Sequence, residues 1–422
     1  ALSSGLLTAA EDAAPATPPI PRLVSENGQH RFLVDGKPFL MLGGQAHNST
    51  TSNADDLQRY FEALVWMNAN TAEVPIYWEL IEPEPGTYDF TIVDRTIQMA
   101  RDAGVRLIFL WFASWKNGES HYAPAWVKRD LGTYPRVLDA WGKRTDILSP
   151  LSQASRDADA RAFNAVMQHI RKVDEAHRTV VMMQVENEPG FLHTDRDYSE
   201  PAEELFKGQV PHALLAYLRE RRDGLSETMK AILAGSGYPE SGTWEEVFGR
   251  FAEEAFTAWH IAQYVDHVTA AGKEAYPLPM YVNAWLVEPG GERPGKWPSG
   301  GPTEHVMDIW KCAAPDVDLL APDIYFPKFA FYAKQYTRPD NPLFVPEINK
   351  NPFFAPYPMI TLVRFNGLNA TVFGMDDVKT NPVGQLFRVA YGVLQPLLPL
   401  IEERRYTDKM HPFVQGISEG ED

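Results

Sequence analysis

An apolar run followed by an amphipathic segment recurs along most of this chain, and this repeat constrains the fold more than any other feature of the sequence. Nearly continuous apolar runs separated by helical segments are typical of the buried strands of a parallel sheet. The eight runs are Pro38–Gly44, Thr71–Trp78, Arg106–Ala113, Val180–Glu188, Pro279–Trp285, Asp318–Tyr325, Leu343–Ile348 and Ala370–Asp376. Eight such units over about 370 residues predict an α/β fold, a (β/α)8 TIM barrel with insertions.

The segments between the runs place their apolar residues at helical spacing. They are Asp55–Met67, Ile92–Ala103, Arg161–His177, Phe248–Ala271, His305–Ala313, Phe329–Tyr336, Ile360–Phe365 and Gln385–Arg405. The longest insertion, Phe191–Val247, follows the fourth run and is expected to fold over one face. A doubly wound open sheet is the alternative. It favours a glycine-rich phosphate loop after the first strand, and Gly43-Gly44 is not such a loop.

Composition divides the chain into three expected segments. Residues 1–24 include the Ala/Pro-rich stretch Ala9–Pro21 and resemble the mature end left by signal cleavage, followed by a linker. Residues 25–410 are expected to form the barrel and residues 411–422 a C-terminal tail. A periplasmic or secreted location is therefore expected. The single cysteine, Cys312, excludes internal disulfides.

The chain is acidic, with 56 Asp and Glu residues against 39 Lys and Arg residues and a formal net charge of -17. A surface of that sign disfavours nucleic acid and anionic membranes as partners, and it suits a protein that acts on neutral molecules. No run of 18 apolar residues is present, so no transmembrane helix is expected. Nothing in the sequence indicates an oligomeric state.

The ends of the expected strands carry carboxylates, amides and aromatic rings, and functional groups of a barrel lie at these ends. The fourth strand ends at Glu186, Asn187 and Glu188, and the seventh ends at Glu347. Further polar or aromatic residues end the other strands: Trp115, Asn283, Trp285, Asp323, Tyr325 and Asp376. A ring of such groups is what a sugar-cleaving site needs.

Glu188 and Glu347 form the candidate catalytic pair. Retaining glycoside hydrolysis needs two carboxyl groups about 5–5.5 Å apart, one to attack the anomeric carbon and one to protonate the leaving oxygen. Strands four and seven lie far enough across a barrel mouth for the two carboxyl groups to flank one bond. No His, Cys or Asp cluster has metal-ligand spacing, so neither a metal nor another cofactor is expected.

Three segments carry a resemblance to a known family. Gln184–Gly190 resembles the Gln-Val-Glu-Asn-Glu-Tyr-Gly signature of glycoside hydrolase family 35, the β-galactosidases of clan A, and departs from it at Pro189. Glu82–Gly86 is similar to the Glu-Pro-x-Pro-Gly turn after strand two of that family, and Phe32–Gly44 to its opening segment. The resemblance covers about residues 31–377 and is nearest to a bacterial branch.

The resemblance implies a retaining exo-β-galactosidase that removes terminal β-galactosyl residues from the side chains of oligo- or polysaccharides. It implies that Glu188 is the acid/base, Glu347 the nucleophile and Asn187 the amide that binds the sugar 2-hydroxyl. Glu186 is expected to support the site, because residues two apart face the same side of an extended strand. Trp78 stands at the position of a family tryptophan.

Two departures bear on the sugar. Better-studied members of the family carry Ala-Glu-Trp after strand three, where this chain has Ala113-Ser114-Trp115, and a sugar-contacting Tyr on strand two, where it has Pro75. Galactose recognition is therefore expected to use other groups. The candidates for substrate binding are Trp78, Trp115, Lys116, Asn117, Asn283, Trp285 and Tyr325. For the aromatic residues, the alternative is that they pack in the core or in the wall of the barrel. For Lys116 and Asn117, the alternative is that they belong to a solvated loop.

Two further interpretations stay open. The first keeps the site and changes its specificity, as in another exo-β-glycosidase or a transglycosylase. The second is a non-catalytic carbohydrate-binding protein, and the intact pair of Glu188 and Glu347 argues against it. Relatives in the resembled family carry a β-rich domain after the barrel. This sequence stops at Asp422, so it is either truncated or a minimal form.

Overall fold

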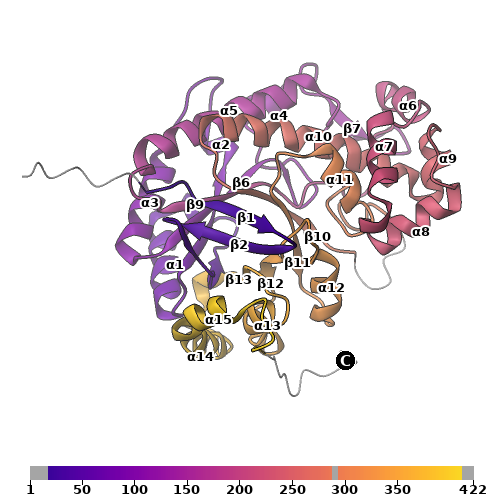
Figure 1. The fold of residues 1–422 in the computed structure, drawn as a ribbon. Coiled ribbons are helices and arrows are strands. Elements are labelled where there is room, and N and C mark those ends of the chain that lie inside the picture. Colours follow the sequence, from indigo (N-terminus) through magenta and orange to yellow (C-terminus); the bar gives the residue numbers. More distant parts are fainter. Residues whose placement is uncertain (1–17, 288–292, 411–422) are drawn as a thin grey trace, which may run out of the picture.

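The computed structural model describes residues 18–287 and 293–410 of the chain. Its centre is a closed barrel of eight parallel strands, which confirms the expected fold (Figure 1). The strands follow one another around the barrel in sequence order: β4 (Gly43–Gln45), β5 (Thr71–Tyr77), β6 (Arg106–Lys116), β9 (Val180–Asn187), β10 (Met280–Trp285), β11 (Leu319–Ile324), β12 (Phe344–Ile348) and β13 (Asn369–Phe373). Each overlaps one of the eight expected runs. Most of the expected leader and the whole expected tail lie outside the described residues.

Helices surround the barrel (Figure 1). Those connecting the barrel strands are α1 (Ala54–Trp66), α2 (Trp78–Ile81), α3 (Thr91–Ala103), α4 (Ala125–Arg129), α5 (Gln153–Asp174), α10 (Ala252–Ala275), α11 (Met307–Ala313), α12 (Phe329–Tyr336) and α13 (Tyr357–Arg364). The helix expected at the C-terminal end is broken into α14 (Gly384–Leu394) and α15 (Leu398–Arg404). The turn between them contains Pro396, which has no N–H to continue an α-helix. No helix in the described ranges is long and apolar enough to cross a membrane.

A small antiparallel sheet closes one end of the barrel. It consists of β1 (Arg22–Glu26), β2 (Gln29–Val34) and β3 (Lys37–Pro38). Phe32 and Val34 of β2 pack into one buried cluster with the inward-facing Ile108 and Phe344. Ile108 and Phe344 lie near the starts of their strands. The N-terminal end of the barrel is therefore sealed by apolar side chains, which leaves the opposite end for chemistry.

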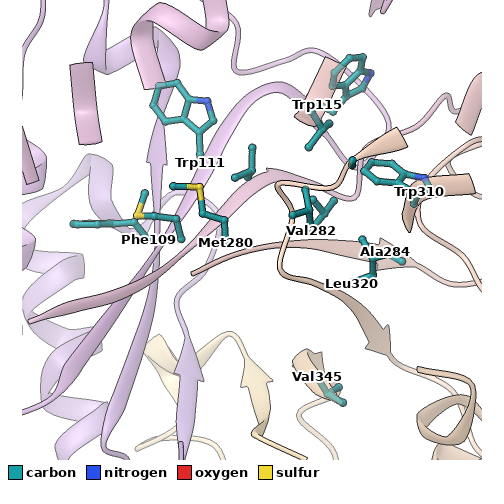
Figure 2. Packing of buried hydrophobic residues seen from close by; sticks show 14 of the residues in the cluster. Phe109, Trp111, Trp115, Met280, Val282, Ala284, Trp310, Leu320 and Val345 are labelled. Carbon is teal, nitrogen blue, oxygen red and sulfur yellow. The ribbon is translucent and has the colours of Figure 1, made fainter. Parts of the chain in front are cut away.

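The outward faces of the strands pack against the helices in a second, larger core. Phe109 and Trp111 of β6 belong to it, together with Met280 of β10 and Trp310 of α11, and all are buried (Figure 2). Burying side chains of this size stabilises a fold by about 1.5–3 kcal/mol each. The barrel is thus held between an inner and an outer layer, and its strand ends are rigid supports.

The insertion after β9 forms a separate group of helices beside α10 and α11 (Figure 1). It contains α6 (Glu200–Phe206), α7 (His212–Glu220), α8 (Glu227–Ser236) and α9 (Trp244–Phe248). The Thr243 hydroxyl caps α9 by accepting a hydrogen bond from the Glu246 N–H, and the Glu246 carboxylate accepts one from the Thr243 N–H. A second excursion, between β6 and α5, carries the hairpin of β7 (Arg136–Leu138) and β8 (Arg144–Leu148).

Close packing of α5 against α10 depends on a glycine. A Cβ atom added to Gly272 of α10 would lie 2.3 Å from Cε1 of Phe163 on α5 and 3.1 Å from the Met280 Cε atom of β10. Real Cβ contacts are not as short as 2.3 Å, so either the Phe163 ring would have to move or the two helices would have to separate. Gly272 therefore sets the distance at which α5 and α10 cover β9 and β10.

We expect Gly272→Ala to lower the free energy of unfolding by about 1–3 kcal/mol, because an added methyl group overpacks the helix interface. Gly235→Ala in α8 is the matched control, since a Cβ there meets nothing within 4 Å. The control is expected to raise stability by up to about 1 kcal/mol through helix propensity. Urea denaturation measures both. Equal stability of Gly272→Ala and the wild type would contradict the packing argument.

Candidate active site

Three buried carboxyl groups meet at the C-terminal end of the barrel. Glu188 directly follows β9, Asp323 lies on β11 and Glu347 on β12. One carboxylate oxygen of each lies within 4.8 Å of the others, and the residues are only 5%, 1% and 5% exposed respectively. The expected pair of Glu188 and Glu347 is therefore brought together, and a third acid accompanies it.

The backbone at the end of β9 turns Glu188 into this cluster. Glu186 and Glu188 have φ values of +61° and +45°, in the left-handed region that non-glycine residues seldom adopt. The Glu188 N–H donates to Asn283 Oδ1 at 2.8 Å, and Asn283 Nδ2 donates to Asp323 Oδ2 at 2.7 Å. Asn283, predicted as a substrate contact, thus connects the acid at β9 to the acid at β11.

A register irregularity of β12 orients Glu347. Its pairing with β13 shifts between Val345 and Ile348, and Pro346 lies within that interval. The shift interrupts the alternation of inward and outward side chains, since Val345 belongs to the outer core. The Tyr325 hydroxyl donates to Glu347 Oε2 at 2.5 Å. The predicted residue Tyr325 therefore contacts the expected nucleophile.

Two carboxyl groups of the cluster, those of Glu188 and Asp323, retain protons more strongly than isolated carboxyl groups do. Burial raises the pKa of Glu188 to about 7, the nearby Glu347 adds to that rise, and Lys116 opposes it. Burial also raises the pKa of Asp323 well above its usual range, with the charges of Glu347 and Glu188 adding to the effect. Crowded, buried carboxyl groups behave in this way because ionising all of them together is costly.

The structure places Glu186 away from this cluster, which corrects the sequence prediction. Glu186 is fully buried and accepts a hydrogen bond from the Trp115 N–H at 2.7 Å. Burial and the Asp159 charge raise its pKa well above the usual range. Asp159 belongs to α5, on the outside of the barrel. The left-handed φ values break the two-residue alternation on which the prediction rested.

Two tryptophans predicted to bind substrate are core residues instead. Trp78 and Trp115 are both completely buried, so neither ring face can meet a ligand. Trp78 donates through Nε1 to Glu82 at 2.8 Å, and Trp115 packs edge-on against Tyr264 of α10 with ring centres 4.7 Å apart. Figure 2 shows Trp115 in the outer core. Both aromatic side chains fill space between strands and helices.

Two of the other predicted residues are suitably placed to act on a ligand. The side-chain amide of Asn187 is completely buried, and neither its nitrogen nor its oxygen has a partner among the described residues. Lys116 lies near enough to Glu188 to influence its pKa, and its ammonium group is 5.0 Å from the centre of the Phe112 ring. A buried amide without a partner is costly unless a ligand satisfies it.

The remaining two predicted residues border the site. The Asn117 N–H donates to the Asn187 carbonyl oxygen at 3.1 Å, so its backbone secures the turn after β9. Trp285 is partly exposed at the end of β10, where it pairs in register with Asp323. Its ring is therefore available at the mouth of the barrel.

Asp323 was a strand-end candidate in the sequence but was not among the predicted catalytic or binding residues. The feature of the sequence that could have indicated it is an acidic residue near the end of the apolar run Leu319–Ile324, which forms a buried barrel strand. Together with Glu188 and Glu347 it is also the only group of acids, histidines or cysteines in the described ranges close enough to share a metal ion. The expected absence of a metal stays a prediction.

Ser114 does not replace the glutamate of the resembled family, because its hydroxyl bonds Asp159 and the Tyr264 hydroxyl outside the barrel. Pro75 offers only its carbonyl oxygen, which accepts a hydrogen bond from Thr51 Oγ1 at 2.7 Å. Neither position supplies a substitute for the missing family side chain.

Comparison with known proteins identifies a related family. A family model described as Beta-galactosidase, that of glycoside hydrolase family 42, matches residues 48–231. The beta-galactosidase of Xanthomonas manihotis is 28% identical over 180 residues, which are 40% of this chain and 27% of that protein. The chain thus spans little more than a quarter of the length of this curated relative.

Solved structures share the fold at low identity. A catalytic mutant of a family-42 beta-galactosidase from G. stearothermophilus has a TM-score of 0.57 at 15% identity, over 86% of this chain and 57% of that chain. The catalytic domain of a beta-amylase from Paenibacillus polymyxa has a TM-score of 0.57 at 11% identity, over 84% of this chain and 98% of that chain. These likenesses concern the fold alone.

The matching model corrects the family expected from the sequence, because it is that of family 42 and not of family 35. The short segment Gln184–Gly190 carried most of the earlier resemblance, and it already departed at Pro189. A strand end that presents an acid follows from barrel geometry, so a motif of this length does not separate families that share the barrel. The expected kind of enzyme, a β-galactosidase, agrees with the matching model.

We expect Lys116→Met to raise the pKa of Glu188 above about 7, because the substitution removes the nearby positive charge that lowers it. Carbon-13 NMR titration of labelled glutamate carboxyl carbons, with Glu188→Gln for assignment, measures the shift. Lys128→Met is the matched control, since Lys128 pairs with Glu79 at the surface and should leave the Glu188 titration unchanged. A lowered or unchanged pKa in Lys116→Met would contradict the assigned electrostatics.

Proposed function

We propose that the protein is a retaining, exo-acting β-galactosidase that removes terminal β-galactosyl residues from neutral glycans. The fold alone does not select this reaction, because β-galactosidases and a β-amylase share it. The observation that carries the proposal is the separation of less than 4.8 Å between carboxylate oxygens of Glu188 and Glu347. Retaining enzymes place these groups about 5–5.5 Å apart, whereas inverting enzymes need about 6.5–9.5 Å. The match to the beta-galactosidase family model supports the sugar.

The reaction proceeds in two displacements. Glu347 attacks the anomeric carbon and forms a glycosyl ester, while Glu188 gives its proton to the departing glycosidic oxygen. Glu188, now ionised, takes a proton from water. That water attacks the anomeric carbon, releases Glu347 and leaves galactose with its original anomeric configuration. The Tyr325 hydroxyl, 2.5 Å from Glu347, stabilises the carboxylate before attack and after release.

The electrostatics of the cluster suit these roles. With a pKa of about 7, Glu188 holds its proton in mildly acidic solution and can still lose it to the leaving group. As pH rises through about 7 this proton is lost, so kcat/KM is expected to fall on the alkaline side. One carboxylate oxygen of Asp323 lies within 4.8 Å of one from Glu188, and in its protonated form Asp323 adds no third negative charge.

The burial of Asn187, Glu188 and Glu347 supports the proposed sugar contacts and the proposed exo-action. The unpartnered amide of Asn187 lies between Glu186 and Glu188 in the chain, where a sugar hydroxyl can satisfy both of its atoms. Glu188 and Glu347 are each only 5% exposed. A terminal sugar reaches such a recessed pair more readily than an internal unit of a polysaccharide does. These features favour exo-action on a single terminal residue.

We expect Glu347→Gln to abolish hydrolysis of aryl β-galactosides, because an amide cannot act as the nucleophile. Glu188→Ala should lower kcat by about 10²–10⁴ on methyl β-galactoside, and much less on an activated aryl galactoside whose leaving group needs no proton. Glu403→Gln, an exposed carboxylate on α15, is the matched control and should behave as wild type. Steady-state kinetics on both substrates measure these changes.

The stereochemistry of the first product decides between mechanisms. Proton NMR of the fresh hydrolysate should show β-galactose before mutarotation. Initial α-galactose would contradict the retaining assignment. Hydrolysis of β-glucosides or β-arabinopyranosides at a higher kcat/KM than β-galactosides would contradict the proposed sugar.

A further inference from the structure

A cavity of about 480 Å³ lies beside the barrel mouth. Its described lining comes from α8, α10, α12, the 3-10 helix Gly249–Phe251 and the segments that precede α11 and follow β10. Four aromatic side chains face it: Phe251, Trp297, Phe331 and Tyr332. Phe331 is 57% exposed, so its ring can contact a ligand. Neither Glu188 nor Glu347 lines this cavity, so it is distinct from the site of bond cleavage.

One wall of the cavity, formed by residues 297–305, is hydrogen-bonded to the segment that follows Glu188. Phe191 and Ser299 exchange two backbone hydrogen bonds of 3.0 Å each. A Cβ atom on Gly190 would meet Pro298 at 2.5 Å, so the two segments are in tight contact. The residues of this wall, Trp297 to His305, therefore lie alongside the three residues that follow Glu188. The cavity is on the side of the expected proton donor.

The opposite wall, formed by residues of α12, packs against the segment that carries Tyr325. Phe326 follows Tyr325 directly, and its ring lies 5.9 Å from that of Tyr332, centre to centre. Leu286, which lines the cavity, follows Trp285 at the end of β10. The cavity thus borders the barrel mouth between the ends of β9, β10 and β11. A group attached to the oxygen that Glu188 protonates would extend toward it.

The chemistry of the lining suits a neutral carbohydrate. The buried Glu254 carboxylate is paired with His305 at 2.6 Å and accepts from Trp297 Nε1 at 2.8 Å, so its charge is locally compensated. Glu304 accepts a hydrogen bond from Thr228 at 2.8 Å, and two arginines, Arg250 and Arg293, border the cavity. Aromatic faces with hydrogen-bonding groups around them bind the apolar face and the hydroxyls of a sugar ring.

We propose that this cavity binds sugar units on the leaving-group side of the scissile bond, and so makes the protein selective for galactosyl oligosaccharides over simple galactosides. The inference rests on the proposed function, because it assigns the cavity to the same reaction. The insertion with α8 and the start of α10 supplies one wall, which gives this excursion from the barrel a role in substrate selection. A volume of about 480 Å³ lies within the range of small-molecule sites.

The test compares methyl β-galactoside, whose leaving group cannot reach the cavity, with a panel of neutral trisaccharides that end in β-galactose. The wild type should hydrolyse at least one trisaccharide with a kcat/KM about tenfold above that of methyl β-galactoside. Phe331→Ala should lower the ratio of the two values about five- to tenfold, as truncation of an aromatic contact commonly does. Leu400→Ala, 50% exposed on α15, is the matched control and should leave the ratio unchanged.

The outcomes separate the two proposals. If the wild type does not hydrolyse aryl β-galactosides, the proposed function fails. If it hydrolyses them but no trisaccharide is preferred, or if Phe331→Ala lowers both kcat/KM values equally, the leaving-group site is overturned. A sulfated or carboxylated trisaccharide preferred over every neutral one would assign the cavity to an anionic ligand held by the arginines, and would also overturn the proposal.

Discussion

Glu188, Asp323 and Glu347 bring one carboxylate oxygen each within 4.8 Å of the others in a place that water scarcely reaches. Burying three like charges so close together is prohibitive, so the cluster persists because it retains protons and receives hydrogen bonds. Burial lifts the pKa of Glu188 from 4.5 to about 7. A raised pKa means that the folded state keeps a proton that the unfolded state has released. The cluster therefore weakens the fold progressively as pH rises from about 4.5 to about 7.

The barrel around the cluster is sealed at one end by apolar side chains and contains further buried acids that are hydrogen-bonded. Apolar residues of β2 close the N-terminal end of the barrel. The three carboxyl groups lie at its C-terminal end. Beneath the cluster, the buried Glu73 of β5 accepts a hydrogen bond from Asn369 at 2.9 Å, and burial raises its pKa to about 8. On the outer side of the barrel, Glu186 of β9 and Asp159 of α5 hold the C-terminal ends of β9 and β6 together. The two left-handed residues, Glu186 and Glu188, are examples of strain kept at a functional site by the structure around it.

The sequence predicted the barrel because the apolar runs are long, regular and separated by helices, and all eight became strands. It also predicted that Glu188 and Glu347 would meet, since the position of a strand in a barrel determines where its C-terminal end lies. It did not predict the direction of Glu186, because a left-handed φ at that residue is imposed by tertiary contacts. Trp78 and Trp115 were misassigned for a related reason. Aromatic residues near a strand end serve packing and binding equally well, and only their burial distinguishes the two. The contribution of Asp323 depends on its closeness to the ends of two other strands, which no local pattern records.

The central claim is that Glu347 attacks the sugar while Glu188 protonates the leaving oxygen and Asp323 keeps its proton. A 2-deoxy-2-fluoro-β-galactosyl fluoride tests it most directly, because the fluorine slows release of the glycosyl-enzyme and lets it accumulate. Peptide mass spectrometry of the inactivated protein should find the label on Glu347. Labelling of Asp323, which lies in the same cluster, or hydrolysis of β-galactosides without any trapped intermediate, would contradict this account.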